Sequence, residues 1–146
     1  MVTDEGSGGF TVERILGAPP ERVFAAFVEP AKLEHWFVVE GFTTPADRMR
    51  VDAQPGGRVD AVMVGDDGTE IPFGFEYVEL ERPGRVVLAF AEPRETVTVT
   101  LREKAGGTHL TYTYLRWPAP EDVAASRQGV VTMLDTIEDG IARGII

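Results

Sequence analysis

The segment from Glu121 to Arg143 constrains the fold most, because it carries one apolar stripe at helical spacing. Its apolar residues recur three, four or seven positions apart. They are Val123, Val130, Leu134, Ile137 and Ile141, with Val131 and Met133 beside them. Pro118 and Pro120 before the segment and Gly144 after it are typical of helix boundaries. Such a helix would be about 34 Å long, which is long enough to cross and cover a small sheet.

The region in front of this helix alternates apolar and polar residues and is interrupted by turns that contain Gly or Pro. The predicted strands are Phe10–Leu16, Arg48–Ala53, Arg58–Val64, Glu70–Leu80, Arg85–Phe90, Glu95–Lys104 and Thr108–Trp117. Two short helices, Glu21–Val28 and Ala31–Phe37, are predicted after the first strand, and a loop at Gly41–Asp47. The alternation fails at Tyr77–Leu80, which indicates a β-bulge.

These elements predict one α+β domain over residues 10–146, preceded by a flexible leader at residues 1–9. A seven-stranded antiparallel sheet that curls strongly has a concave face larger than its own side chains can fill. The long C-terminal helix is expected to lie across this face, and the two short helices to close one end. A cavity between helix and sheet is the predicted consequence.

Composition excludes several classes of function. The formal net charge of −10 argues against binding to nucleic acid or to an anionic membrane, because both would require a basic surface. The chain has no cysteine, which excludes thiol catalysis, disulfides and thiolate metal sites. No apolar run is long enough for membrane insertion and no secretory signal is visible, so we expect a cytoplasmic protein. Oligomeric state is left open, with a twofold homodimer as the common case.

The chain resembles the SRPBCC, or START-like, superfamily with the helix-grip fold. Three segments carry the resemblance: ILGAPPERVFAAFVEPAKLEHWF at Ile15–Phe37, AQPGGRV at Ala53–Val59, and VTVTLREKAGGTHLTYTY at Val97–Tyr114. With the final helix they are most similar to the family named after the C-terminal domain of the heat-shock protein 90 ATPase activator. A cone-shaped domain of the nuclear-transport-factor-like kind is the rival fold, but such a chain usually ends in strands.

The resemblance implies the helix-grip fold, which hosts lipid carriers, cyclases and hydrolases alike. Eukaryotic activators of this family also carry an N-terminal domain with an Asn/Trp/His-rich motif that stimulates the chaperone. The residues before the first predicted strand contain no such motif. The resemblance therefore gives no reason to expect the chaperone-activating role of that N-terminal domain.

No catalytic or metal-binding constellation is recognisable in the sequence. The two histidines are His35, near the expected cavity mouth, and His109, which strand parity points outward. His35 is the one candidate for a general acid or base. No His, Cys or carboxylate spacing indicates a metal, and no phosphate-binding loop or nucleophile motif indicates a cofactor.

The candidate binding residues are the apolar, aromatic and arginine side chains expected on the concave face, at its mouth, or on the covering helix. They are Trp36, Phe37, Met63, Phe75, Tyr77, Phe90, Tyr112, Tyr114, Arg116, Trp117, Val130, Met133 and Leu134. Arg116, if it faces inward, would select a ligand that carries a carboxylate. Gly129 indicates a close contact with the sheet, a kink, or space for a ligand.

The leading hypothesis is therefore a small soluble domain that binds a hydrophobic or aromatic small molecule in this cavity. One alternative is a cyclase/dehydratase or hydrolase that uses His35, a tyrosine, and Glu138 or Arg116. The other alternative is a chaperone-associated interaction module.

Overall fold

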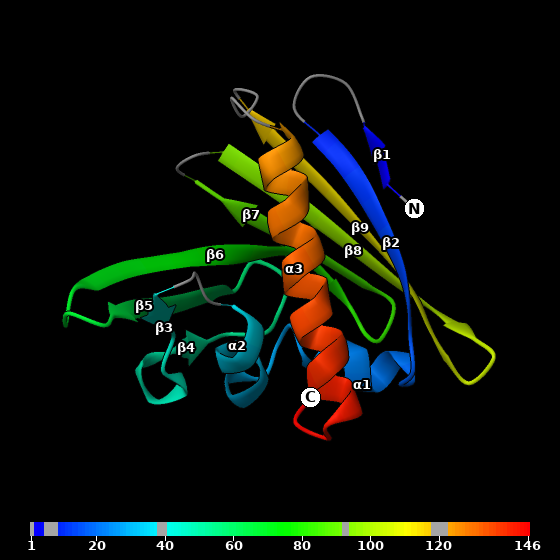
Figure 1. The fold of residues 1–146 in the computed structure, drawn as a ribbon, viewed down its shortest axis with the longest axis horizontal. Helices are drawn as coiled ribbons and strands as arrows, with labels where there is room; N and C mark the ends of the chain where they lie inside the picture. Colours follow the sequence, from blue (N-terminus) through cyan, green and yellow to red (C-terminus); the bar gives the residue numbers. More distant parts are fainter. Residues whose placement is uncertain (1, 5–8, 38–40, 92–93, 118–122) are drawn as a thin grey trace.

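A computed structural model of the chain describes residues 2–4, 9–37, 41–91, 94–117 and 123–146 (Figure 1). A curled antiparallel sheet forms one layer, and helix α3 crosses its concave face, as expected for a helix-grip α+β domain. The strands follow the order β1-β2-β9-β8-β7-β6-β5-β3, and β4 also pairs with β5. Their bounds are β1 Val2–Asp4, β2 Gly9–Leu16, β3 Phe42–Thr43, β4 Arg50–Val51, β5 Arg58–Gly65, β6 Glu70–Glu81, β7 Arg85–Phe90, β8 Arg94–Lys104 and β9 Gly107–Trp117.

The long strands begin and end close to the turns that Gly and Pro residues predicted in the sequence. In the turn before β5, Gly56 has a φ of +84°, a left-handed conformation that glycine adopts without strain. Gly74 in β6 allows close pairing with β5, since a Cβ there would lie 2.2 Å from the carbonyl oxygen of Val59. The predicted bulge is confirmed, because the pairing of β6 with β7 shifts register between Tyr77 and Glu79.

The described residues also form three α-helices: α1 Pro20–Ala25, α2 Pro30–Trp36 and α3 Val123–Ala142. Both short helices begin with proline, whose missing N–H is not needed there. They lie together at one end of the sheet, beside the C-terminal end of α3 (Figure 1). The predicted stripe of α3 is buried at Val130, Leu134, Ile137 and Ile141, and Pro118 and Pro120 lie outside the described residues.

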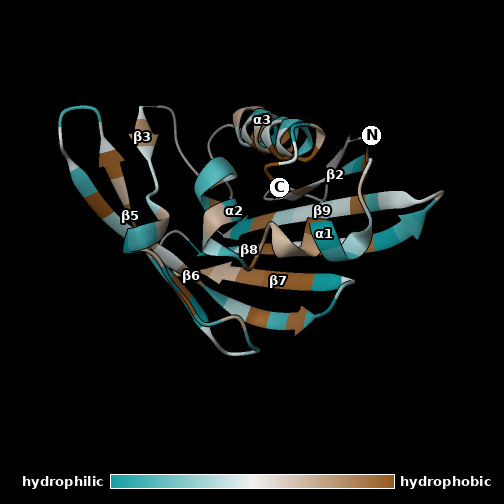
Figure 2. Ribbon diagram, turned by 90° about the horizontal axis from the view of Figure 1, so that it is seen from below, coloured by the Kyte–Doolittle hydropathy of each residue, from teal (hydrophilic) through white to brown (hydrophobic). Residues whose placement is uncertain are grey.

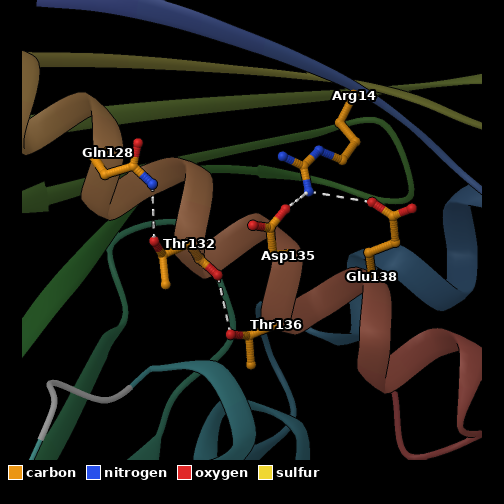
Figure 3. A network of polar contacts seen from close by, with 6 residues as sticks. All are labelled: Arg14, Gln128, Thr132, Asp135, Thr136 and Glu138. Atoms are coloured by element: carbon orange, nitrogen blue, oxygen red, sulfur yellow. Dashed lines mark hydrogen bonds and ion pairs between the residues drawn. The ribbon is translucent and has the colours of Figure 1, made fainter.

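Polar contacts fix α3 against the first long strand. Arg14 belongs to the inner face of β2, and its Nη1 reaches Asp135 at 2.6 Å and Glu138 at 3.2 Å on α3 (Figure 3). At the helix C-terminus, the Arg22 guanidinium donates to the carbonyl oxygens of Ile146 (2.7 Å) and Ile141 (3.0 Å). The bond to Ile141 adds a donor to a carbonyl of the last helical turn, and the bond to Ile146 holds the segment that follows the helix.

The core lies between the sheet and α3. In Figure 2, which looks along the axis of α3, bands of hydrophobic and hydrophilic residues alternate along the strands, as a half-buried sheet requires. Val97, Val99 and Leu101 of β8 face inward and are buried, whereas Thr98 and Thr100 between them are only partly buried. No helix in the described part of the chain is long and apolar enough to cross a membrane.

Three expectations about the elements are corrected. In the described part of the chain the sheet has nine strands rather than seven, because Val2–Asp4 and Phe42–Thr43 also pair in it. The leader expected at residues 1–9 is therefore wrong for residues 2–4 and for Gly9, which begins β2; residues 1 and 5–8 lie outside the described part. The strand expected at Arg48–Ala53 shrinks to Arg50–Val51, since Ala46–Arg48 forms a 3-10 turn.

Candidate functional site

A cavity of about 670 Å³ opens between α3 and the part of the sheet that α2 adjoins. Six elements or their edges supply its wall, from α2 through β5, β6, β8 and β9 to α3. The lining residues are Trp36, Phe37, Met63, Phe73, Glu95, Tyr114, Ser126, Gly129, Val130, Thr132, Met133 and Thr136.

Aromatic rings form the wall opposite α3. The ring of Phe37 lies 4.8 Å from that of Phe73, 5.3 Å from that of Phe75 and 5.5 Å from that of Trp36, measured between centroids. The Trp36 indole Nε1 donates to the carbonyl oxygen of Ala26 at 2.7 Å. This bond satisfies the polar edge of the indole and fixes its orientation, so its apolar faces remain for packing and for the cavity.

The side of α3 that faces the cavity carries small residues where it could have carried large ones. Ser126, Gly129, Thr132 and Thr136 follow one another at three- and four-residue spacing along the helix. A Cβ placed on Gly129 would meet no atom within 4 Å, so this glycine faces open space. The hydroxyl of Thr136 donates a hydrogen bond to the carbonyl oxygen of Thr132 at 3.1 Å (Figure 3), so this polar group is satisfied within the helix.

One corner of the cavity is polar. The Tyr114 hydroxyl, on β9, donates a hydrogen bond to Glu95 Oε2 on β8, and both residues line the cavity. Burial raises the pKa of Tyr114, and the neighbouring Glu95 carboxylate raises it further. Burial also raises the pKa of Tyr112, with a second contribution from Glu95. Both phenols are therefore held in the protonated form that can donate to a carboxylate.

Of the thirteen residues predicted to bind a ligand, six line the cavity: Trp36, Phe37, Met63, Tyr114, Val130 and Met133. Phe75, Tyr77, Tyr112 and Leu134 are buried in the hydrophobic core instead. The Tyr77 hydroxyl donates to the carbonyl oxygen of Phe27 at 2.6 Å, so its partner is the backbone. Phe90 is partly buried, with its ring 5.5 Å from that of Phe75.

The two predicted residues at the end of β9 have different outcomes. Arg116 pairs with Glu95 in the register of β8 and β9 and therefore points to the same, inner face. It is partly buried and is not among the residues that line the cavity. Trp117 ends β9 opposite Arg94, and its side chain lies outside the described residues.

The residues considered for catalysis are not gathered at the cavity. His35 is exposed on α2 and does not line it. His109 lies on the outer face of the sheet, where its Nε2 is 3.0 Å from Glu13 Oε1, and Glu138 is paired with Arg14. Within the described ranges, no group of three or more His, Asp or Glu residues is placed to hold a metal ion.

Sequence reasoning missed Glu95, Phe73 and the small polar residues of α3. Strand parity could have found the first two, because Glu95 shares the parity of Val97 and Phe73 shares that of Phe75. The helical residues could have been found from their spacing to Gly129, which was already recognised as unusual. In the polar corner, Tyr114 was therefore predicted and Glu95 was not.

A curled antiparallel sheet that holds a long C-terminal helix over an apolar cavity defines a helix-grip protein of the SRPBCC superfamily. Residues 17–141 match the model of the family described as "Activator of Hsp90 ATPase homolog 1-like protein". The chain belongs to this family, as its sequence pattern indicated. A search of curated proteins found no match.

Solved structures of bacterial proteins share the fold over nearly the whole chain. A protein from Rhodobacter sphaeroides superposes with a TM-score of 0.82 at 20% identity, covering 98% of each chain. An AHSA1-like protein from Aeromonas hydrophila gives 0.77 at 22% identity, covering 94% of this chain and 95% of its own. A protein from Chromobacterium violaceum gives 0.77 at 26% identity, covering 90% and 96%. The first two likenesses establish the fold alone.

Proposed function

We propose that this protein binds a hydrophobic or aromatic small molecule in the cavity between the sheet and α3. The observation that carries the proposal is a cavity of about 670 Å³ with a mostly apolar wall and few polar groups. Its size lies within the range of roughly 300–1,000 Å³ that is usual for small-molecule sites. The aromatic wall around Phe37 suits a flat or aromatic ligand, because rings gain from stacked and edge contacts.

The residues on α3 support a cavity that is kept open. Gly129 costs about 1 kcal/mol relative to alanine inside a helix, yet a side chain at this position would have met only open space. Met63 and Met133 contribute flexible, polarizable side chains that can adapt to ligands of different shape. A wall made only for packing would use these positions to fill the space.

A neutral fluorescent probe tests the proposal. N-phenyl-1-naphthylamine should become more fluorescent on binding, and a concentration near one hundred times its dissociation constant should stabilise the fold by about 2.7 kcal/mol. Gly129→Leu should weaken binding by roughly tenfold or more, because overlap with a new side chain costs about 1–3 kcal/mol. The helix itself should tolerate the change, since leucine has the higher helix propensity.

Ala124→Leu is the matched control. Ala124 is an exposed residue of the same helix and is not among the lining residues, so the variant adds a similar side chain away from the cavity. Binding should equal that of the parent. If Gly129→Leu and the parent bind the probe equally while both remain folded, the ligand does not occupy this cavity and the proposal is wrong.

A further inference from the structure

We propose that Glu95 is the polar anchor of the cavity, and that the ligand therefore joins an apolar or aromatic body to a cationic, hydrogen-bond-donating group such as an amine. This inference rests on the proposed function, because it concerns the ligand of the same cavity. It differs from the acidic ligand that the sequence analysis assigned to an inward-facing Arg116.

The register of the sheet places Glu95 on the inner face. Glu95 pairs with Phe90 on one side and with Arg116 on the other, one step beyond the buried row of Leu88, Val97 and Tyr114. Side chains of directly paired residues lie on the same face. The carboxylate is therefore directed into the concave side of the sheet, where it is partly buried and lines the cavity.

Glu95 has acceptor capacity left for a ligand. Tyr114 donates to its Oε2, and the described part of the chain supplies no further hydrogen bond or ion pair within 4.0 Å to the carboxylate. A carboxylate accepts through both oxygens, so Oε1 remains for a donor that enters the cavity. Tyr114, itself part of the wall, positions the carboxylate from one side.

The other polar side chains of the wall do not supply a comparable charge. Ser126, Thr132 and Thr136 are neutral hydroxyls, and Glu95 is the one ionisable carboxylate or base among the lining residues in the described part of the chain. Hydrogen bonds with one ionised partner are about twice as strong as neutral ones. An amine would gain that interaction at Glu95, whereas a ligand carboxylate would be repelled by it.

Arg116 is the competing consideration. It is the pairing partner of Glu95, and its guanidinium acts on the Tyr114 hydroxyl by lowering the pKa that burial and Glu95 raise. Yet no ion pair joins Arg116 to Glu95 within the described residues, and Arg116 does not line the cavity. The carboxylate is thus the charge that a ligand meets in the wall.

Three naphthalenes that carry a cationic, a neutral or an anionic group test the inference: 2-naphthylmethylamine, 2-naphthylmethanol and 2-naphthoate. Each is titrated at neutral pH against bound N-phenyl-1-naphthylamine, and its dissociation constant is obtained from displacement. The amine should bind about tenfold or more tightly than the alcohol, and the carboxylate most weakly. In Glu95→Gln, which keeps the size of the side chain and an oxygen for Tyr114, the amine should lose this advantage while the alcohol binds as before.

Glu103→Gln is the control for overall charge. Glu103 is an exposed residue of the same strand, so the variant removes one negative charge far from the lining residues. It should keep the preference for the amine. Equal binding of all three compounds, tighter binding of the carboxylate, or an amine preference that survives in Glu95→Gln overturns the inference and leaves the proposed function standing. Failure of all three compounds and of the probe to bind refutes both.

Discussion

Replacing Tyr77 by phenylalanine should destabilise the protein through one lost hydrogen bond. Tyr77 is fully buried, and its hydroxyl donates to the carbonyl oxygen of Phe27 at 2.6 Å. The bond ties β6 to the segment between α1 and α2. Phenylalanine keeps the ring, which packs edge-on against Phe75 at 5.3 Å, so little packing is lost. No other hydrogen bond to the Phe27 carbonyl is found within the described part of the chain.

The expected loss of stability follows from the carbonyl of Phe27, which is left without a hydrogen-bond donor. A typical hydrogen bond contributes about 1 kcal/mol net, but leaving a buried acceptor without a donor costs about 1–3 kcal/mol. We therefore expect Tyr77→Phe to lower the free energy of unfolding by about 2 kcal/mol. For a domain of this size, that corresponds to a fall in melting temperature of roughly 4–8 °C.

Equilibrium unfolding in urea, followed by tryptophan fluorescence, measures this loss. Tyr112→Phe is the matched control, because Tyr112 is also buried but its hydroxyl makes no hydrogen bond within the described residues. Its free energy of unfolding should stay within about 0.5 kcal/mol of the parent, since no acceptor loses a donor. If Tyr77→Phe unfolds at the same urea concentration as the parent, or if the two variants lose equal stability, the bond to Phe27 does not stabilise the fold as argued.

Two further predictions concern the helix and the tyrosines. Leu134→Ala should lower the free energy of unfolding by about 2–5 kcal/mol, because Leu134 is fully buried. Asp135→Ala should lower it by no more than about 1 kcal/mol, as is usual for an exposed ion pair. Equal urea midpoints for both variants would contradict the assignment of the buried stripe. The pKa of each of the three tyrosines is raised, chiefly by burial. Unfolding returns these groups to an ordinary pKa near 10, so the unfolded state loses protons first, and stability should be full below about pH 10 and fall above it. Phenolate absorbance should therefore appear near pH 10 only in urea-unfolded protein, and its appearance there in the folded protein would show that the hydroxyls are accessible.

Much of the fold was predictable because its signals are local and repeated. The stripe of α3, the Gly and Pro turns and the alternation along β8 and β9 each specify one element and one buried face. The short strands had no such signal. Phe42–Thr43 and Arg50–Val51 are two residues each, too few to show a period, and Val2–Asp4 is a strand of three residues that pairs with β2.

The site was less predictable because charged residues on its inner face depend on distant partners. Arg14 shares the inward parity of Val12 and Leu16, and it is accommodated there by Asp135 and Glu138, more than 120 positions away. Glu95 likewise faces inward beside Tyr114. Strand parity places such residues on the inner face, but no local pattern shows which distant groups will accept their charge there. The volume of the cavity could not be predicted from the sequence either, because it depends on how strongly the sheet curls and on the distance between α3 and the sheet.

The arrangement of α3 separates the contacts that hold the helix from those that form the cavity. Its buried stripe, with Leu134 and Ile137, lies between two flanks. One flank carries Asp135 and Glu138 and is bound to Arg14 of β2 (Figure 3). The C-terminal end of the helix is bound by Arg22. The other flank carries Gly129 and the threonines of the cavity wall. Because the stabilising contacts lie on the stripe and the first flank, substitutions on the cavity flank should change ligand selectivity at little cost in stability.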